Sequence, residues 1–282
     1  MNKIIALLTD FGLNNHFVGT MKGVILTVDP EINIYDITHQ IQPQNILEAA
    51  YSLADTIPYW PENTLFAVVV DPGVGTSRRS LIVRAGTGHG IICPDNGILT
   101  LVEQEFGLLD VYEISVKNRL PGTNAYHTFH GRDIYAYNAA RIVSGKVISS
   151  EIGHPIKNPI ERLKIHEAKI THENIHGNIV KIEKPYGNLC TNIPMHLFSI
   201  LKISYGDYLE YIIFEDGKER LKGKLPFVRT FGEVVHNEAL LYIDSSGRLG
   251  FAINRGNFSD NFQIYAGTTW EVRLKKQAVK KN

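Results

Sequence analysis

The feature that most constrains the fold is a change in the pattern of apolar residues about halfway along the chain. In the first half, short apolar runs typical of strands alternate with segments typical of helices. Strands are predicted at residues 4–8, 32–37, 65–70, 81–85, 91–93 and 111–114, and helices at residues 16–28, 43–57, 96–106 and 132–143. This alternation predicts an α/β domain at residues 1–160, with a largely parallel sheet covered on both faces.

The second half of the chain has a different pattern. After residue 170, short β runs are separated by turns rich in Gly and Asp, with one short helical segment at residues 195–201. This pattern predicts a small all-β, barrel-like domain at residues 161–282. The stretch at residues 149–158, which contains Gly153 and Pro155, is predicted to be a linker.

Composition and charge exclude several classes of protein. The 282 residues suffice for two domains, and 29 basic and 29 acidic residues give a formal net charge of zero. A neutral chain argues against broad nucleic-acid binding, which needs a basic surface. Cys93 and Cys190 form neither a metal-binding spacing nor a disulfide framework, which fits a reducing cytoplasm. The first apolar run is too short for a signal peptide, and none approaches membrane-spanning length, so we expect a cytoplasmic protein with no membrane partner.

The segment at residues 71–78, DPGVGTSR, follows a buried strand and is the first candidate for chemistry. A charged residue at the carboxyl end of such a strand is well placed to meet a ligand. Asp71 and Arg78 flank the glycine-rich loop, and the alternative is a structural salt bridge that braces it. His130 precedes a predicted helix, whose dipole favours a neutral imidazole that can accept a proton, although a structural role is the default for a single histidine.

Three other groups of residues are ambiguous in isolation. Asp10 ends the first strand and suits either a ribose diol or a helix cap. The sequence at residues 185–188, PYGN, suits either a planar heterocycle or a simple turn. Phe231 and the pair Asn254–Arg255 carry no clear signal alone. No histidine spacing indicates a metal site.

Taken together, these segments resemble a family. Six motifs occur in order at residues 9–12 (TDFG), 70–79 (VDPGVGTSRR), 94–97 (PDNG), 128–133 (TFHGRD), 185–192 (PYGNLCTN) and 245–247 (SSG). This order is similar to that of the S-adenosyl-L-methionine hydrolases, also called hydroxide adenosyltransferases, which are relatives of the 5′-fluoro- and 5′-chloro-5′-deoxyadenosine synthases. The resemblance runs from about residue 3 to about residue 275.

The resemblance implies an α/β domain, a β-barrel-like domain and a homotrimer, with the substrate between the first domain of one subunit and the second domain of the next. It implies a catalytic set of Asp71, Arg78 and His130, with no cofactor and no metal. The residues implied to bind substrate are Asp10 at the ribose hydroxyls, Tyr186, Asn188, Phe231, Asn254 and Arg255 around adenine, Glu183, Ser245 and Ser246 at the methionine end, and Asn96, Phe129 and Gly131 elsewhere in the site.

The halogenating relatives differ at the reacting centre. They carry a tyrosine at the position of Asp71, a threonine at that of Val74 and a serine at that of Gly131. The hydroxyls that hold a halide are therefore missing here, which favours water as the nucleophile. The expected reaction is hydrolysis of S-adenosyl-L-methionine to adenosine and L-methionine. The alternatives are a 5′-halogenase and a non-catalytic protein that binds adenosine or S-adenosylmethionine, with a metal-dependent hydrolase a distant third.

Overall fold

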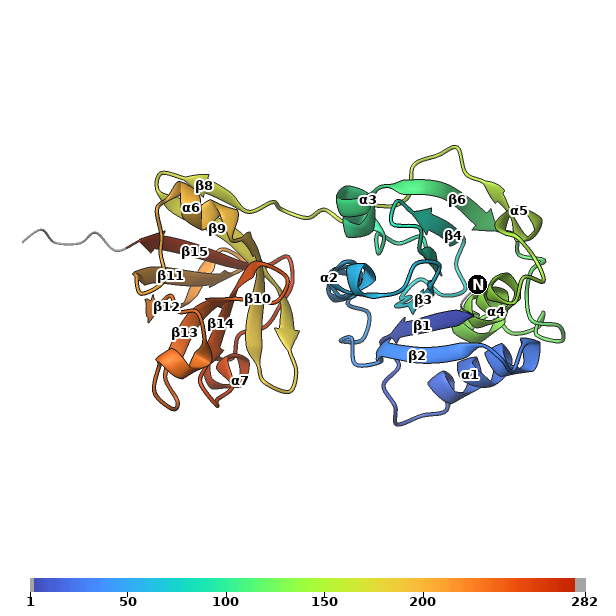
Figure 1. Ribbon diagram of the computed structural model, residues 1–282, viewed down its shortest axis with the longest axis horizontal. Coiled ribbons are helices and arrows are strands. Elements are labelled where there is room, and N and C mark those ends of the chain that lie inside the picture. The colour runs from blue at the N-terminus through green and yellow to red at the C-terminus, as the bar shows by residue number, and fades with distance from the viewer. Residues whose placement is uncertain (1–2, 277–282) are drawn as a thin grey trace, which may run out of the picture. The chain divides into compact units, whose positions relative to one another are not determined.

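The computed structural model describes residues 3–276, and the chain divides into two compact units, Met1–Leu163 and Lys164–Asn282. Each unit encloses its own hydrophobic core. Figure 1 labels most of the helices and strands of both units. Among residues 3–276, no helix has the length and apolar character needed to cross a membrane.

The first unit is built on a seven-stranded sheet in the order β2-β1-β3-β5-β4-β6-β7. Its strands are β1 (Ile4–Thr9), β2 (Asn33–Thr38), β3 (Leu65–Val69), β4 (Ser80–Ala85), β5 (Gly90–Pro94), β6 (Leu108–Ile114) and β7 (Gly153–Pro155). The strands from β2 to β5 in this order pair in parallel, whereas β4, β6 and β7 pair antiparallel. The prediction of a largely parallel sheet is therefore only partly right, because the sheet is mixed. A tight turn joins β4 to β5, and such a turn connects antiparallel neighbours, whereas a parallel pair needs a long crossover.

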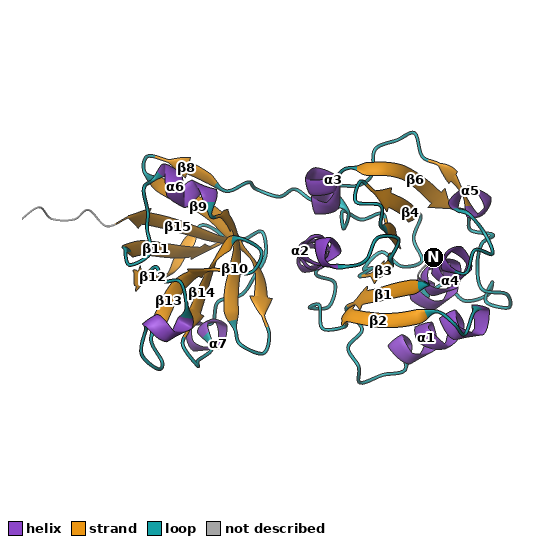
Figure 2. Ribbon diagram, in the orientation of Figure 1, coloured by secondary structure: helices purple, strands orange, loops and turns teal. Residues whose placement is uncertain are grey.

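Helices cover both faces of this sheet, as the alternating pattern predicts (Figure 2). Ala6 and Leu8 of β1 pack into one core with side chains of α2 and α3. Ile5 and Leu7 point to the opposite face and pack with α1 and α4. The helices are α1 (Phe17–Val28), α2 (Ile46–Thr56), η1 (Ile57–Tyr59), α3 (Thr100–Phe106), η2 (Gly131–Ala136), α4 (Tyr137–Val143) and α5 (Ser149–Ile152).

Two helices start later than predicted, because asparagine side chains end the preceding loops. Asn45 accepts a hydrogen bond from the Glu48 backbone nitrogen and caps α2, so Pro43 lies in the loop before the helix. Asn96 uses its amide to hold the carbonyl of Val70 and lies outside α3. The Oδ1 atom of Asn96 also accepts from the backbone nitrogen of Ile98, so both asparagines form local hydrogen bonds that compete with the helix.

The prediction of a linker at residues 149–158 is wrong. This stretch contains α5 and the short strand β7, which pairs with β6. Ile152 is fully buried in the core of the first unit, and its burial ties the segment down. The predicted helix at residues 132–143 also begins differently, as the π-helical turn η2 followed by α4.

The second unit is an antiparallel sheet in the order β12-β11-β15-β9-β10-β14-β13, with β8 paired to β9. Its elements are β8 (Lys169–Thr171), β9 (Asn174–Glu183), β10 (Asn188–Pro194), α6 (His196–Ile200), β11 (Tyr208–Glu215), β12 (Lys218–Pro226), η3 (Phe231–Glu233), β13 (Ala239–Ile243), β14 (Arg248–Ile253), α7 (Phe258–Phe262) and β15 (Trp270–Lys276). Phe227, just after β12, bridges to Leu241 in β13. The sheet therefore curls into a half-barrel, in agreement with the predicted barrel-like character.

The strand β12 was not predicted, because its residues lack the alternation that marks a half-buried strand. It is an edge strand, and most of its side chains are exposed. Charged side chains on an edge strand discourage pairing with another chain. β12 is a strand because it pairs with β11, although its own sequence has no apolar pattern typical of a strand.

Candidate active site

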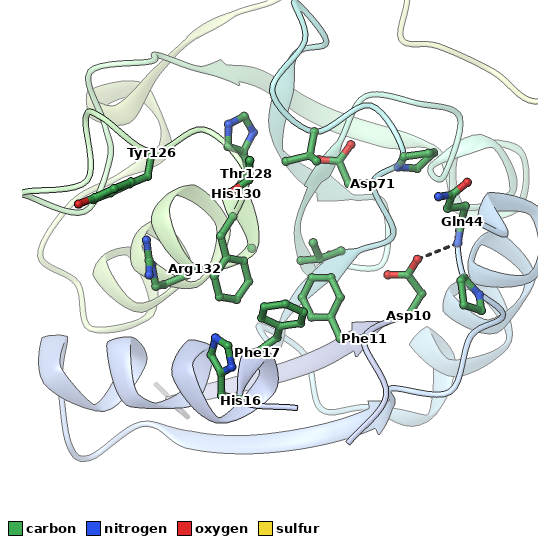
Figure 3. Close-up of a pocket in the computed structure, with 16 residues that line it drawn as sticks. Asp10, Phe11, His16, Phe17, Gln44, Asp71, Tyr126, Thr128, His130 and Arg132 are labelled. Carbon is green, nitrogen blue, oxygen red and sulfur yellow. Dashed lines mark hydrogen bonds between the residues drawn. The ribbon is translucent and has the colours of Figure 1, made fainter. Parts of the chain in front are cut away.

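A cavity of about 780 Å³ opens at the carboxyl end of the parallel strands in the first unit. Asp10 follows β1 and Asp71 follows the neighbouring strand β3, so both carboxylates reach the same edge of the sheet (Figure 3). The cavity is lined by Asp10, Phe11, His16, Phe17, Pro43, Gln44, Val69, Asp71, Pro72, Val74, Tyr126, Thr128, Phe129, His130, Gly131 and Arg132.

Asp71, Arg78 and His130 lie together, as the sequence analysis expects. The Nη2 atom of Arg78 is 2.5 Å from Oδ2 of Asp71 and 3.2 Å from Nδ1 of His130. The side chains of Asp71 and Arg78 are 5% and 8% exposed, so the ion pair is shielded from solvent. Arg78 does not line the cavity itself, but it hydrogen-bonds to Asp71 and His130, which both do.

The contact with Arg78 determines which nitrogen of His130 carries the proton. A guanidinium only donates hydrogen bonds, so Nδ1 is the acceptor and the proton of the neutral ring sits on Nε2. Burial, reinforced by the positive charge of Arg78, lowers the pKa of His130 to about 4. The imidazole is therefore neutral at pH 7 and offers an N–H donor from Nε2, with burial as the main cause.

The pKa of Asp71 is shifted in the opposite direction to that of His130. Burial raises the pKa of its carboxyl above the ordinary value of 3.8, although Arg78 opposes this shift. Its Oδ2 atom is held by Arg78, whereas Oδ1 is buried and accepts no hydrogen bond from residues 3–276. A carboxylate oxygen that is buried and unpaired at the edge of a cavity is suited to accept a proton.

The guanidinium of Arg78 is fixed from its other side by Tyr135. Nη1 of Arg78 donates to the Tyr135 hydroxyl at 2.8 Å and to the carbonyl of Arg79 at 2.6 Å. Tyr135 is fully buried and lies in η2, the π-helical turn that directly follows His130. The sequence analysis missed this tyrosine, and no local signal identifies it, because it is 57 positions from Arg78.

The cavity wall also contains an aromatic cluster, in which Phe129 was predicted as a site residue and Phe11 and Phe17 were not. The rings of Phe11, Phe17 and Phe129 meet edge to face, with centroids 5.1–5.9 Å apart. Gly131 lies against this cluster, and a Cβ atom there would be 3.1 Å from Phe129 and 3.3 Å from Phe11. A larger residue at position 131 would therefore have to displace one of these rings.

Two further predicted residues of the first unit have different surroundings. Asp10 lines the cavity, and its Oδ2 atom accepts a hydrogen bond from the Gln44 backbone nitrogen at 2.8 Å (Figure 3). Asn96 does not line the cavity. Its amide donates to the Val70 carbonyl at 2.9 Å, so it steadies the backbone next to Asp71.

A second cavity, of about 870 Å³, lies in the second unit. It brings together seven of the predicted residues, namely Glu183, Tyr186, Asn188, Phe231, Ser245, Asn254 and Arg255. They come from four places along the chain and meet because the half-barrel places the ends of β9, β13 and β14 and the turn η3 around one hollow. Tyr242 and Asp244 also line it, and the sequence analysis missed both.

Hydrogen bonds organise the floor of this second cavity. Oε2 of Glu183 accepts from Nδ2 of Asn188 at 3.1 Å and from the Tyr242 hydroxyl at 3.4 Å. The ring of Phe231 packs against Tyr242 with centroids 4.9 Å apart. Carboxylate, amide and aromatic groups are thus held close together, as a polar heterocyclic ligand requires.

Ser246 lies apart from the other predicted residues of the second unit. It does not line the cavity but forms the exposed turn between β13 and β14, where its backbone nitrogen donates to Oδ1 of Asp244. Tight turns place successive side chains in different directions, so only Ser245 of the pair faces the cavity. Among residues 3–276, no group of three or more His, Cys, Asp or Glu side chains is arranged to hold a metal ion.

Comparison with known proteins agrees with this two-part arrangement. Residues 5–153 match the SAM hydroxide adenosyltransferase N-terminal domain, and residues 177–271 match the C-terminal domain of the same family. This chain therefore belongs to the SAM hydroxide adenosyltransferase family.

Individual relatives carry two different names. The (R)-S-adenosyl-L-methionine hydrolase of Methanocaldococcus jannaschii is 34% identical, over 92% of this chain and 89% of the relative. The fluorinase of an Actinoplanes species is 29% identical, over 96% of this chain and 97% of the relative. A solved structure of an uncharacterized conserved protein from Thermotoga maritima is 34% identical and superposes with a TM-score of 0.87, covering 96% of this chain and 99% of that chain.

Proposed function

We propose that this protein is an enzyme that hydrolyses S-adenosyl-L-methionine to adenosine and L-methionine, by in-line attack of water on the ribose C5′ atom. The observation that carries the proposal is the cluster of Asp71, Arg78 and His130 at the edge of the first cavity. Asp71 and His130 both line this cavity, and the cluster combines a carboxylate oxygen that has no hydrogen-bond partner with a neutral imidazole. The hydrolase names of several relatives support this assignment.

The chemistry needs a base but no acid at sulfur, because a sulfonium leaves as a neutral thioether. We assign the base to the carboxylate of Asp71, which lines the cavity and can take a proton from the attacking water. His130 donates from Nε2 and orients that water, and Arg78 holds both groups in place. A positioned base contributes about 10²–10⁴-fold to the rate. Alignment of the water with the C5′–S bond supplies a further part of the acceleration.

The remaining predicted residues form the binding site in this proposal. Asp10 takes the ribose hydroxyls in the first cavity. The second cavity takes adenine between Tyr186, Asn188, Phe231, Asn254 and Arg255, and Glu183 and Ser245 bind the methionine end. In the proposed homotrimer, the first unit of one subunit and the second unit of the next complete each site.

Halogenation is the competing reaction, since some relatives are named fluorinase. The first cavity argues against it at two points. The anionic Asp71 repels a halide, and Val74 and Gly131 provide no hydroxyl to hold one. Water is therefore the nucleophile in the proposed reaction.

The test is incubation of the purified protein with S-adenosyl-L-methionine in water enriched in ¹⁸O, with and without chloride. We expect adenosine and methionine independently of chloride, with ¹⁸O at the 5′-oxygen of adenosine. This label shows that water attacked C5′. A chlorinated nucleoside would instead assign the chain to the halogenases. Binding of S-adenosyl-L-methionine without any product would indicate a non-catalytic binding protein.

The pH dependence of turnover provides a separate prediction. Turnover requires Asp71 without its proton, so kcat should fall as the pH drops through the pKa of this carboxyl, which burial raises above 3.8. His130 also titrates at low pH, since its pKa is about 4, so variants of both residues are needed to assign this limb. We therefore expect the acid limb to persist in His130→Gln, at a lower overall rate, and to disappear from the residual activity of Asp71→Asn. Loss of the limb in His130→Gln would show that the histidine is the titrating group.

A further inference from the structure

The first cavity has ends of opposite charge. Asp10 lies at one end with Gln44, and Asp71 and His130 lie between the two ends (Figure 3). Arg132 lies at the other end, together with Tyr126 and His16 (Figure 3). A ligand that spans the cavity therefore meets a carboxylate at one end and a guanidinium at the other.

The guanidinium of Arg132 is held in place with its outer edge free. Its Nε atom donates to Oδ1 of Asp133 at 2.6 Å, and its carbon lies 5.3 Å from the ring centroid of Phe129. Its two terminal nitrogens hydrogen-bond to none of residues 3–276, and its side chain is 26% exposed. Four N–H donors are thus available on a rigidly held fork.

The charge of Arg132 is not cancelled by its neighbour. Asp133 is fully buried, and its other oxygen accepts from Nη2 of Arg119 at 3.2 Å. One carboxylate therefore serves two arginines, and the group of three carries a net positive charge. A free arginine fork with surplus charge is the preferred partner of a carboxylate or phosphate.

We propose that Arg132 binds the α-carboxylate of the amino-acid part of the substrate, so that Glu183 and Ser245, assigned above to the methionine end, face its ammonium group. This inference rests on the proposed function, which sets the order of groups along the ligand. With the ribose at Asp10 and the C5′–S bond at Asp71 and His130, the chain beyond sulfur extends towards Arg132. Arg132 then distinguishes adenosyl sulfonium compounds that bear a carboxylate from those that lack one.

The test compares S-adenosyl-L-methionine with its decarboxylated analogue, which keeps the adenosyl group, the sulfonium and the amine. Dissociation constants from titration calorimetry and kcat/KM are measured for both compounds on the wild-type protein and on Arg132→Gln. We expect the substitution to weaken the binding of S-adenosyl-L-methionine by about 10–100-fold, which is the usual contribution of a charged hydrogen bond. The binding of the decarboxylated analogue should change little. The preference of the wild-type protein for the carboxylate compound should therefore collapse.

Two further variants separate recognition from folding. Arg119 is the other arginine that donates to Asp133, and it does not line the cavity. The variant Arg119→Gln should therefore keep the wild-type preference between the two compounds. Arg132→Lys keeps the charge but loses the fork and should give an intermediate preference, which also serves if Arg132→Gln folds poorly.

The outcomes distinguish this inference from the proposed function. An unchanged preference in Arg132→Gln and Arg132→Lys overturns the role of Arg132, whether or not the enzyme turns over. Tight binding that depends on the carboxylate in the wild-type protein and loses this dependence in Arg132→Gln, without hydrolysis, upholds Arg132 and rejects the hydrolase. Failure of the wild-type protein to bind either compound overturns both.

Discussion

Replacing Asp71 with asparagine is expected to lower kcat by about 10²–10⁴-fold while substrate binding stays close to that of the wild-type protein. The amide oxygen can still accept from Arg78, but an N–H donor then takes the place of Oδ1, the buried oxygen that is free to accept a proton. Because aspartate and asparagine have nearly the same size, the fall in kcat measures the contribution of the base and not a change in packing. Single-turnover kinetics and calorimetric titration with S-adenosyl-L-methionine measure the two effects separately.

Asp95→Asn is a matched control for this variant. Asp95 is also a buried carboxylate paired with an arginine, since it lies 2.5 Å from Nη2 of Arg79, but it does not line the cavity. We expect Asp95→Asn to reduce the free energy of unfolding and to leave kcat within a few-fold of wild type. Comparable kcat values for Asp71→Asn and the wild-type protein would place the base elsewhere.

Replacing Asp133 with alanine is expected to lower the free energy of unfolding of the first unit by about 3–5 kcal/mol. Asp133 is fully buried and accepts hydrogen bonds from Arg132 and Arg119. Its removal leaves the Arg119 guanidinium, whose side chain is only 9% exposed, without its charged partner. Urea denaturation followed by circular dichroism measures this loss.

Asp110→Ala is the control for the loss of a surface ion pair. Asp110 lies 3.7 Å from Arg84, and both side chains are more than half exposed. Exposed pairs contribute little, so this variant should change the free energy of unfolding by less than about 1 kcal/mol. A similarly small effect of Asp133→Ala would show that Arg119 finds another partner or water when the carboxylate is removed.

Much of the fold and part of the site could be predicted from local patterns. The alternation of apolar strands such as β1 with helical segments indicated a sheet covered on both faces, and both faces are covered. The positions of Asp10 and Asp71 at strand ends indicated that these carboxylates lie at the edge of the sheet where a ligand could bind, and both line the first cavity. These predictions succeeded because apolar period and strand ends depend on neighbours in the chain.

Other features could not be predicted in this way. The antiparallel half of the first sheet, the exposed strand β12 and the folding of residues 149–158 onto β6 all depend on pairing with distant strands. Asn96 and Ser246 belong to motifs that suggest substrate contact, yet each faces away from its cavity because the surrounding turn directs its side chain.

The sequence by itself determined the two-domain organisation, the likeness to a family and the types of residue available for chemistry. Only the tertiary structure decided that Arg78 bridges Asp71 and His130, that Tyr135 holds it from behind, and that Arg132 keeps a free fork in the cavity. Arg78 is 52 positions from His130 and 57 from Tyr135. Such contacts arise from the order of strands and the π-helical turn of η2, and no periodicity within one segment encodes them.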